Sequence, residues 1–320
     1  MRWKETDIIT VDTHADSLGA VLSGQRHLTE RSTKGQLDFP RMRQVGHRVQ
    51  FFSCWVEPEY KPDRALTRTL AYIDAFWEEV RHAADLVVPV SDRASLDAAL
   101  TSGKIAALLS IEGADAVTGP GYIVRLLYRL GVRLMSLTWN QRNLLADGAG
   151  EDPGGGGLSQ AGRQVIHQMN EIGMIVDVSH LAEAGFWDVL AVSQKPVIAS
   201  HSNCRALKDH RRNLSDSQIR ALAEKGGVQG ITFVRDFLGA TADVDRVVDH
   251  IVHALDVVGD DRHTGIGSDF DGVEDPVPGL EDVTGWPRLA ERLADRQLSD
   301  DTIRRVLGEN YINFLYDIWA

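Results

Sequence analysis

The chain has 320 residues, 43% of them hydrophobic and 25% charged, which are ordinary values for a globular protein and exclude a disordered, collagen-like or disulfide-rich chain. Its net charge of −12 argues against a general nucleic-acid-binding protein, because an acidic surface repels the phosphate backbone. The two cysteines, Cys54 and Cys204, form no C-x-x-C pair, so we predict free thiols and no structural zinc finger.

The sequence carries no recognisable membrane-spanning or targeting segment. No run approaches the roughly 18 apolar residues of a transmembrane helix, and the first residues, Met1–Asp7, lack the apolar core of a secretory signal. The last residues, Tyr311–Ala320, are expected to form a short amphipathic end rather than an anchor. We therefore expect a cytoplasmic protein with no membrane and no nucleic-acid partner.

Short apolar runs rich in β-branched residues recur along the chain and predict eight strands. These runs are Ile8–Asp12, Val49–Val56, Ile105–Ile111, Leu134–Thr138, Met174–Val178, Val197–Ser200, Val228–Phe233 and Thr264–Gly267. Helical patterns, with apolar residues at three- and four-residue spacing, occupy Arg64–Ala84, Ile123–Leu130, Gln160–Ile172, Leu181–Val192, Asp216–Glu224, Val244–Val258 and Thr302–Asp317. Three polar residues directly before such patterns are predicted N-caps: Ser159, Ser215 and Asp243.

Strands that alternate with helices predict a parallel sheet covered on both faces. The count of eight favours a closed (β/α)8 TIM barrel of the α/β class, formed as a single domain by residues 1–320. The alternative is an open doubly wound sheet, which usually carries a G-x-G-x-x-G turn after its first strand. Here the first strand runs into Val11–Asp16 without phosphate-binding glycines, and Gly154–Gly157 is interpreted as a flexible loop before a helix.

Charged and imidazole side chains follow five of the predicted strands. They are His14 and Asp16, Glu112, His180, His201 and Asp269. Each of them alone has an ordinary structural explanation, such as a hydrogen-bonded core histidine or a carboxylate in an ion pair. In a barrel, however, the carboxyl ends of the strands converge on one mouth, and imidazoles and carboxylates gathered there predict a metal site.

The number of candidate ligands favours two metal ions over one. Five ligands exceed what a tetrahedral zinc with an open position needs, but they suit a pair of ions bridged by one carboxylate and one hydroxide. Glu112 is the natural bridge, because it is the only acid that could serve both sides. Such a pair lowers the pKa of the bridging water, which predicts hydrolytic attack on a carbonyl. His250 and His253 share a helix face without a glutamate partner and are interpreted as solvated surface residues.

Six short motifs along the chain share their order and spacing with a known family. They are Val11–Asp16, Ile111–Gly113, Asp177–His180, Ser200–Ser202, Arg211–Asn213 and Gly267–Gly272. These motifs resemble those of the membrane (renal) dipeptidase family, zinc metallopeptidases of the amidohydrolase superfamily, from about Asp7 to Gly308–Asn310. The resemblance implies a (β/α)8 barrel that holds two zinc ions and usually forms a homodimer.

The resemblance also implies roles for individual residues. The implied metal ligands are His14 and Asp16 for one zinc, His180 and His201 for the other, and Glu112 as the bridge. Asp269 would contact the substrate and act as the acid/base that hands a proton to the leaving amine. Arg212 would grip the substrate carboxylate with its guanidinium, although it lies in a basic run that is also typical of exposed surface. Asp271 would fix a loop.

The sequence departs from the family pattern in two places that concern the substrate. Many relatives carry a histidine that contacts the substrate carbonyl, whereas this chain has Trp139, whose indole N–H can donate a hydrogen bond but is no equivalent proton donor. Asn140, Arg142 or Asn143 are alternatives for that contact. A tyrosine expected after the seventh strand is replaced by Val234 and the arginine that follows it.

The activity that these residues predict is hydrolysis of the peptide bond of a dipeptide, including one with a C-terminal D-residue. A related amidohydrolase that acts on a non-peptide amide or an N-acyl amino acid is the alternative, which Trp139 favours. A third interpretation is a metal-binding barrel without catalysis. Asp269 argues against this third interpretation, because a scaffold needs no acid/base beside its metals.

Overall fold

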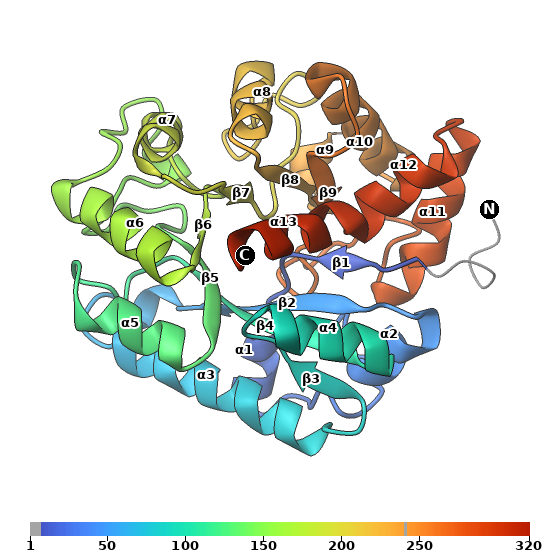
Figure 1. Cartoon of the computed structure of the whole chain (residues 1–320), viewed down its shortest axis with the longest axis horizontal. Coiled ribbons are helices and arrows are strands. Elements are labelled where there is room, and N and C mark those ends of the chain that lie inside the picture. Colours follow the sequence, from blue (N-terminus) through green and yellow to red (C-terminus); the bar gives the residue numbers. More distant parts are fainter. Residues whose placement is uncertain (1–7, 240–241) are drawn as a thin grey trace.

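Eight parallel strands close into a barrel in the computed structural model, which describes residues 8–239 and 242–320 (Figure 1). The strands are β1 (Val11–Asp12), β2 (Val49–Trp55), β4 (Ile105–Glu112), β5 (Val132–Ser136), β6 (Ile175–Asp177), β7 (Ile198–Ala199), β8 (Val228–Ile231) and β9 (Thr264–Ile266). The ring is closed because β1 pairs with both β9 and β2, and β2 pairs with β4. The predicted barrel is therefore confirmed, and the doubly wound alternative is wrong. The predicted signal-free segment Met1–Asp7 lies outside the described residues.

A short additional strand, β3 (Val87–Pro89), was not predicted. It pairs with Ile105–Ala107 in the first half of β4, whereas β5 pairs with the second half of β4 from Leu109 onward. β3 therefore extends the sheet outside the ring of eight. With three residues, β3 is too short to show a strand pattern in the sequence. It also ends in a proline, which lacks the N–H that a sheet hydrogen bond needs and so argues against a strand.

Helices cover the outside of the barrel (Figure 1). They are α1 (Ser17–Leu22), α2 (Phe39–Val45), α3 (Ala65–His82), α4 (Arg93–Ser102), α5 (Tyr122–Arg129), α6 (Gln160–Ile172), α7 (Glu183–Val192), α8 (Asp216–Glu224), α9 (Arg235–Leu238), α10 (Val244–Val258), α11 (Trp286–Asp295), α12 (Asp300–Arg304) and α13 (Asn310–Ile318). The predicted caps Ser159, Ser215 and Asp243 each accept a hydrogen bond from the N–H three residues later. Helices α1, α2, α4, α9 and α11 were not predicted, and of these α1, α2 and α9 have too few turns to show an apolar period. None of the described helices combines the length and apolarity needed to cross a membrane.

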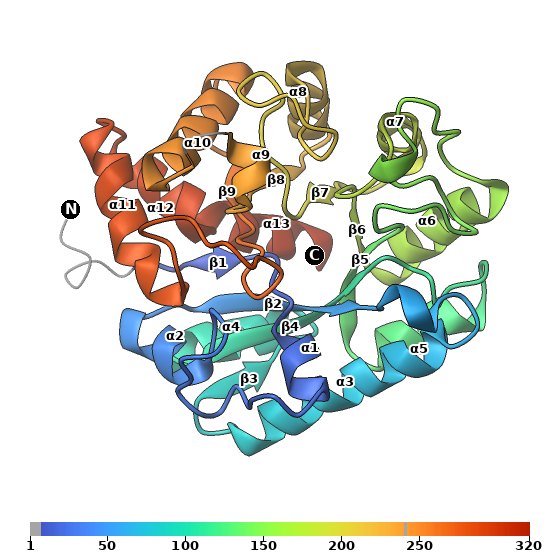
Figure 2. The ribbon, with the colours of Figure 1, turned by 180° about the vertical axis from the view of Figure 1, so that it is seen from behind.

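The C-terminal helix is amphipathic, as predicted, and its buried side closes one end of the barrel. α12 runs through a π-helical turn into α13, which lies across the near end of the barrel in Figure 1. Tyr311 packs over the paired glycines of β8 and β9, where a Cβ atom at Gly265 would lie 2.3 Å from its ring and one at Gly230 2.8 Å from its hydroxyl oxygen. Ile312, Phe314 and Leu315 are buried in one apolar cluster with residues of the barrel strands. The opposite mouth is the one at which the strands end, and Figure 2 shows the loop after β9 and helix α1 beside it.

Candidate metal centre

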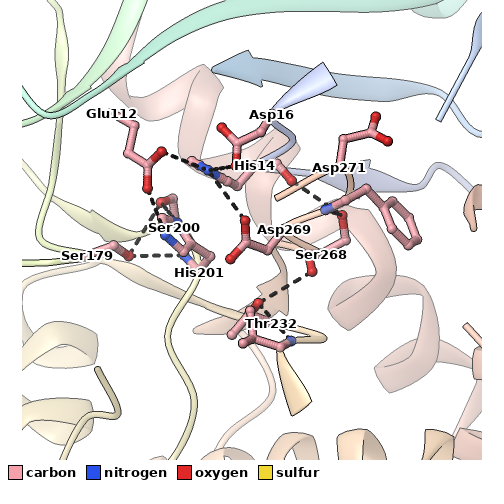
Figure 3. A network of polar contacts seen from close by, with 12 residues as sticks. His14, Asp16, Glu112, Ser179, Ser200, His201, Thr232, Ser268, Asp269 and Asp271 are labelled. Atoms are coloured by element: carbon pink, nitrogen blue, oxygen red, sulfur yellow. Dashed lines mark hydrogen bonds and ion pairs between the residues drawn. The ribbon is translucent and has the colours of Figure 1, made fainter. Parts of the chain in front are cut away.

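The strand ends that the sequence singled out bring their side chains together at this mouth (Figure 3). His14 and Asp16 follow β1, Glu112 ends β4, His180 follows β6, His201 follows β7 and Asp269 follows β9. The three imidazoles and Glu112 are buried, and the other two carboxylates are half-buried. The structure thus gathers all six predicted residues into one cluster.

One part of this cluster is rich in carboxylates. The Nε2 atom of His14 lies 3.6 Å from Oδ2 of Asp16, 3.7 Å from Oε2 of Glu112 and 3.8 Å from Oδ1 of Asp269. Because His14, Asp16 and Asp269 come from the ends of β1 and β9, we call them the β1–β9 half.

The other part consists of imidazoles. His180 and His201 face one another with their Nε2 atoms 2.8 Å apart, and His180 Nε2 lies 2.7 Å from Oε1 of Glu112. We call this pair the β6–β7 half. The two oxygens of Glu112 therefore point to different halves, since Oε2 is the oxygen nearer to His14. That is the placement a bridging carboxylate requires.

The donor atoms of the cluster fit a metal. Among the described residues, Nε2 of His14 and Oδ1 of Asp16 are buried without a hydrogen-bond partner, which is costly unless a cation satisfies them. Two sets of donor atoms lie close enough to share an ion: His14 with Glu112 and His201, and His14 with Asp16 and Asp269. Imidazole nitrogen and carboxylate oxygen are ligands that zinc accepts.

The two halves differ in charge in the metal-free protein. In the β1–β9 half, burial disfavours charged His14, but the carboxylates of Asp16, Glu112 and Asp269 outweigh burial and raise its pKa to about 10. Burial and the Asp16 carboxylate raise the pKa of Asp269 to about 7, although His14 and Arg212 act in the opposite direction. The β1–β9 half thus attracts positive charge, and a proton on His14 supplies some of it.

In the β6–β7 half the imidazoles are neutral. Burial and the positive charges of Arg212 and His14 lower the pKa values of His180 and His201 well below the usual range. The Nδ1 atom of His180 lies 2.9 Å from Oδ1 of Asn140, which can only accept, so the proton of His180 sits on Nδ1 and Nε2 carries a lone pair. Neutral imidazole is the form that binds metal ions.

The backbone bends sharply where two of these residues leave their strands. His180 has φ of 70° and Asp269 has φ of 67°, in the left-handed region that non-glycine residues rarely adopt. Such conformations cost about 1–3 kcal/mol each and persist where surrounding contacts impose them, which is typical of functional sites. The turn at each position directs the side chain into the mouth instead of along the strand.

Asp271 fixes a loop, as predicted. Its Oδ2 accepts hydrogen bonds from the hydroxyl of Ser17 and the guanidinium of Arg26, and its Oδ1 accepts from the backbone N–H of Gln36. These bonds tie the loop after β9 to α1 and to the segment that follows α1. Asp271 thereby holds the rim of the mouth.

A cavity of about 750 Å³ opens above the cluster. Asp16, Glu112, His180 and Asp269 line its base, and the walls include Trp55, Tyr72, Trp139, Asn140, Val234 and Phe237. The predicted substrate residues Trp139 and Asn140 thus face the cavity, and the ring centroids of Trp139 and Trp55 lie 5.3 Å apart. Asn140 not only faces the cavity but also accepts a hydrogen bond from His180, a contact that the sequence did not predict.

Two alternatives for the carbonyl contact are wrong. Arg142 forms an ion pair with Asp147, with Nε 2.5 Å from Oδ1, and Asn143 donates a 2.7 Å hydrogen bond to the carbonyl of Leu137. Both side chains therefore hold their own loop and do not line the cavity. Local sequence could not separate them from Asn140, because the loop conformation decides which side chain turns inward.

Arg212 is buried, with 4% of its surface exposed, so the surface interpretation of this residue is wrong. Its Nη2 donates to the carbonyl of His201 at 3.1 Å, and its guanidinium lies 5.5 Å from the ring of Phe237. Its buried Nε has no hydrogen-bond partner among the described residues. Arg212 is not itself among the residues that line the cavity, but its guanidinium lies beside Phe237, which is one of them.

Comparisons with known proteins agree with this site. The sequence profile of the membrane dipeptidase family (Peptidase family M19) matches residues 4–318. The chain belongs to this family. Dipeptidase aclJ of Aspergillus oryzae is 37% identical over 297 residues, which are 89% of this chain and 70% of that protein. The uncharacterized dipeptidase C965.12 of Schizosaccharomyces pombe is 36% identical over 328 residues, covering 94% of this chain and 78% of the relative.

Two solved structures share the whole fold of this membrane dipeptidase family member. One is dipeptidase AC, a metallopeptidase of family M19, with 28% identity, a TM-score of 0.90, and coverage of 98% of this chain and 99% of that one. The other, a metallopeptidase from Rhodobacter sphaeroides bound to a phosphinate mimic of L-Ala-D-Ala, has the same identity, TM-score and coverage. The predicted family, barrel and enzyme class, a metal-dependent hydrolase, are confirmed.

Two residues of this dipeptidase-family barrel correct the sequence analysis. His250, predicted to be a solvated surface residue, is fully buried: its Nδ1 accepts from the backbone N–H of Cys204 at 3.0 Å and its Nε2 donates to the carbonyl of Leu238 at 3.3 Å. His253 is half-buried and pairs with Asp216 at 2.8 Å. Helical spacing gives the face that the two histidines share, but not whether a neighbouring loop covers it. Cys204 and Cys54 are free thiols, as predicted.

Proposed function

We propose that this family member hydrolyses the peptide bond of dipeptides with two zinc ions. His14 and Asp16 would hold one ion, His180 and His201 the other, and Glu112 would be shared. The observation that carries the proposal is the placement of Glu112, whose Oε2 lies 3.7 Å from His14 Nε2 while its Oε1 lies 2.7 Å from His180 Nε2. When bound, such a pair of ions polarises a substrate carbonyl and lowers the pKa of water.

Asp269 is the proposed proton carrier. Its carboxylate lines the cavity, and its Oδ1 lies 3.8 Å from His14 Nε2, so it would adjoin the reacting bond of a substrate. From there it takes a proton from the attacking water and hands it to the leaving amine. The cavity walls would keep bulk water away from this transfer.

The substrate contacts come from the other side of the site. We infer that Arg212 reads the free C-terminal carboxylate, because its buried Nε is an unpaired donor and a guanidinium suits a carboxylate. The indole N–H of Trp139 or the amide of Asn140 would donate to the substrate carbonyl oxygen. The L-Ala-D-Ala mimic bound by the Rhodobacter sphaeroides protein supports acceptance of a C-terminal D-residue.

The second candidate function is hydrolysis of N-acyl amino acids or other non-peptide amides. Trp139 favours it, because an aromatic wall beside the reacting carbonyl would also accommodate an acyl group without an amine. Arg212 would serve a carboxylate in either substrate class, so the two proposals differ only at the amino end.

One screen decides between the two functions. The purified protein is analysed for zinc and tested on L-Ala-L-Ala, L-Ala-D-Ala, their C-terminal amides and the matching N-acetyl amino acids. Turnover of the free dipeptides above the N-acetyl compounds supports the first proposal, and the reverse order supports the second. Turnover that persists after complete metal removal would contradict both. The homodimer and the cytoplasmic location also remain proposals, which light scattering and cell fractionation can test.

A further inference from the structure

Beneath the predicted ligands, two buried aspartates make the same hydrogen bonds in two places. Asp12, at the end of β1, accepts from the backbone N–H two residues later at 3.2 Å, and from the backbone N–H and hydroxyl of Ser268 at 2.8 and 2.5 Å. Asp177, at the end of β6, accepts from the backbone N–H two residues later at 2.9 Å, and from the backbone N–H and hydroxyl of Ser200 at 2.9 and 2.6 Å. We call these pairs the Asp12–Ser268 clamp and the Asp177–Ser200 clamp.

The two clamps also share their register. Asp12 lies opposite Ile266 in the β1–β9 ladder, and Asp177 lies opposite Ile198 in the β6–β7 ladder. In both ladders the serine follows that partner by two residues. Each clamp therefore ties two neighbouring strands together just beyond their last paired residues, where the backbone leaves the sheet.

Every clamp residue is inaccessible to water, with an exposed fraction of 1% or less. A carboxylate there is stable only because three hydrogen bonds replace water. Burying each of these carboxylates therefore costs desolvation free energy. Neither aspartate lines the cavity, so neither can contact a substrate there. In each clamp, the residue directly after the serine is a predicted site residue: Asp269 follows Ser268, and His201 follows Ser200.

The order of strands places one clamp in each half of the barrel. β4 and β8 lie opposite each other, with β9, β1 and β2 between them on one side and β7, β6 and β5 on the other. The Asp12–Ser268 clamp joins strands of the first side, and the Asp177–Ser200 clamp joins strands of the second side. Glu112, at the end of β4, lies on the dividing line.

We propose that Asp12 and Asp177 are positioning residues, each of which sets the affinity of one metal ion by holding the strand ends of its own half. The inference rests on the two-ion function proposed above. Asp12 would govern the ion of the β1–β9 half, and Asp177 the ion of the β6–β7 half. Residues that hold the ligands of a metal without binding it typically change metal affinity by roughly 10- to 100-fold.

The Asp177–Ser200 clamp has an additional contact that its counterpart lacks. The hydroxyl of Ser200 donates to Asp177, and its oxygen lies 2.7 Å from Nδ1 of His201 (Figure 3). The proton of His201 therefore sits on Nδ1, and Nε2 keeps its lone pair for a metal. In the part of the chain that the structure describes, the hydroxyl of Ser268 contacts no imidazole: besides Asp12, it lies 3.3 Å from the backbone carbonyl oxygen of His14 and accepts a 3.0 Å hydrogen bond from the backbone N–H of Phe270.

This difference predicts unequal variants. In Asp177→Asn, an amide N–H turned toward Ser200 would make the hydroxyl donate to His201 instead, which moves the imidazole proton to Nε2 and blocks metal binding. Asp12→Asn weakens only the attachment of the strand ends. We therefore expect the affinity to fall by roughly 100-fold for the β6–β7 ion in Asp177→Asn and by roughly 10-fold for the β1–β9 ion in Asp12→Asn.

The test is a metal titration of the full chain after removal of metal with a chelator. Calorimetry with Zn²⁺, and visible spectra with Co²⁺, resolve the binding steps of the parent protein. Asp16→Asn and His201→Asn then assign one step to each half, since each removes a ligand of one half only. We expect Asp12→Asn to shift the Asp16 step alone and Asp177→Asn to shift the His201 step alone, with the ring ¹⁵N signals of His201 reporting the moved proton.

Asp38→Asn is the matched control, because Asp38 is equally buried and caps α2 through the N–H of Arg41. It should shift neither step. If an aspartate variant is unfolded by circular dichroism, Ser200→Ala and Ser268→Ala replace the pair and carry the same one-step expectation. Two ions with both steps unshifted, or shifted together by either variant, overturn the inference and leave the function standing. A parent protein that binds at most one ion overturns the two-ion function and the inference with it.

Discussion

Both halves of the proposed metal centre present ligands suited to a cation, but they differ in charge. The β1–β9 half surrounds His14 with carboxylates that raise its pKa to about 10, whereas burial and Arg212 keep His180 and His201 neutral in the β6–β7 half. The first half attracts a cation by charge, and the second offers lone pairs. Glu112 is the only described residue with an oxygen directed to each half. Experiments that remove one half, or the link between them, therefore test this division.

Loss of the shared residue should have the largest effect. A strong chelator should abolish hydrolysis and added zinc should restore it, because both halves lose their ions. Glu112→Gln should lower the zinc content, measured by mass spectrometry, more than Asp16→Asn or His201→Asn, each of which damages one half. Equal zinc loss in all three variants would show that Glu112 serves a single ion.

Removal of the proposed proton carrier comes next. Asp269→Asn keeps the shape of the β1–β9 half but cannot transfer a proton, and positioned proton transfer contributes roughly 10²–10⁴ in rate. We expect kcat to fall within that range while the zinc content stays close to the parent value. A variant that turns over dipeptides at the normal rate would assign the proton to another group.

The substrate contact beside the β6–β7 half should have a smaller effect. A charge-assisted pair between Arg212 and a carboxylate is worth about 1.5–3 kcal/mol, so Arg212→Met should raise KM for free dipeptides roughly 10- to 100-fold. For C-terminally amidated dipeptides, KM should differ little between Arg212→Met and the parent protein. Zinc content is measured in parallel, because Arg212 also donates to the carbonyl of His201.

Arg211→Met is the matched control for this variant, since Arg211 is exposed and its hydrogen bond within the described part of the chain goes to the carbonyl of Gly150, at 3.3 Å. It should leave KM unchanged. If Arg212→Met discriminates between free and amidated dipeptides as the parent does, the carboxylate is read elsewhere, and the Trp139–Asn140 segment becomes the place to look.

The last comparison concerns two buried histidines outside the metal centre, one near the start of β1 and one on α10. Burial lowers the pKa of His47, near the start of β1, to about 3 and that of His250, beside the loop after β7, to about 4. Between these values and about 6.5 only the unfolded chain binds the proton, so the free energy of unfolding rises with pH. Each histidine contributes about 1.4 kcal/mol per pH unit inside its window.

The measurement is the slope of unfolding free energy against pH, from urea unfolding between about pH 4 and 6.5. His47→Gln and His250→Gln should each reduce this slope, whatever they do to the stability at neutral pH. An unchanged slope in either variant would mean that the histidine titrates normally in the folded protein.

The sequence was sufficient to predict the parts of this site that depend on where strands end. His14, Glu112, His180, His201 and Asp269 could be found because each follows an apolar run, and the barrel mouth brings such positions together. The family resemblance added the division of the ligands between two ions. Both inferences use information that is local along the chain.

What the sequence could not provide depends on contacts between distant segments. The contact of Asn140 with His180 is set by the path of one loop, and the burial of His250 is set by the segment around Cys204 that lies over it. The clamp aspartates, Asp12 and Asp177, are the last residues of their strands, and only the pairing of neighbouring strands reveals their serine partners. The burial of Tyr311 is set by β8 and β9, whose glycines lie far away in the sequence.

The two clamps also differ in when they can form as the chain folds. Asp177 and Ser200 are 23 residues apart, whereas Asp12 and Ser268 are 256 apart. On the logarithmic scaling of loop entropy, joining the distant pair in an otherwise unfolded chain costs about 2 kcal/mol more than joining the near pair. The β6–β7 half can therefore take shape from a local βαβ segment. The β1–β9 half has to wait until the first strand meets the last and the ring closes. During refolding, the His180–His201 pair should accordingly become able to bind zinc before the carboxylates of the β1–β9 half are in place.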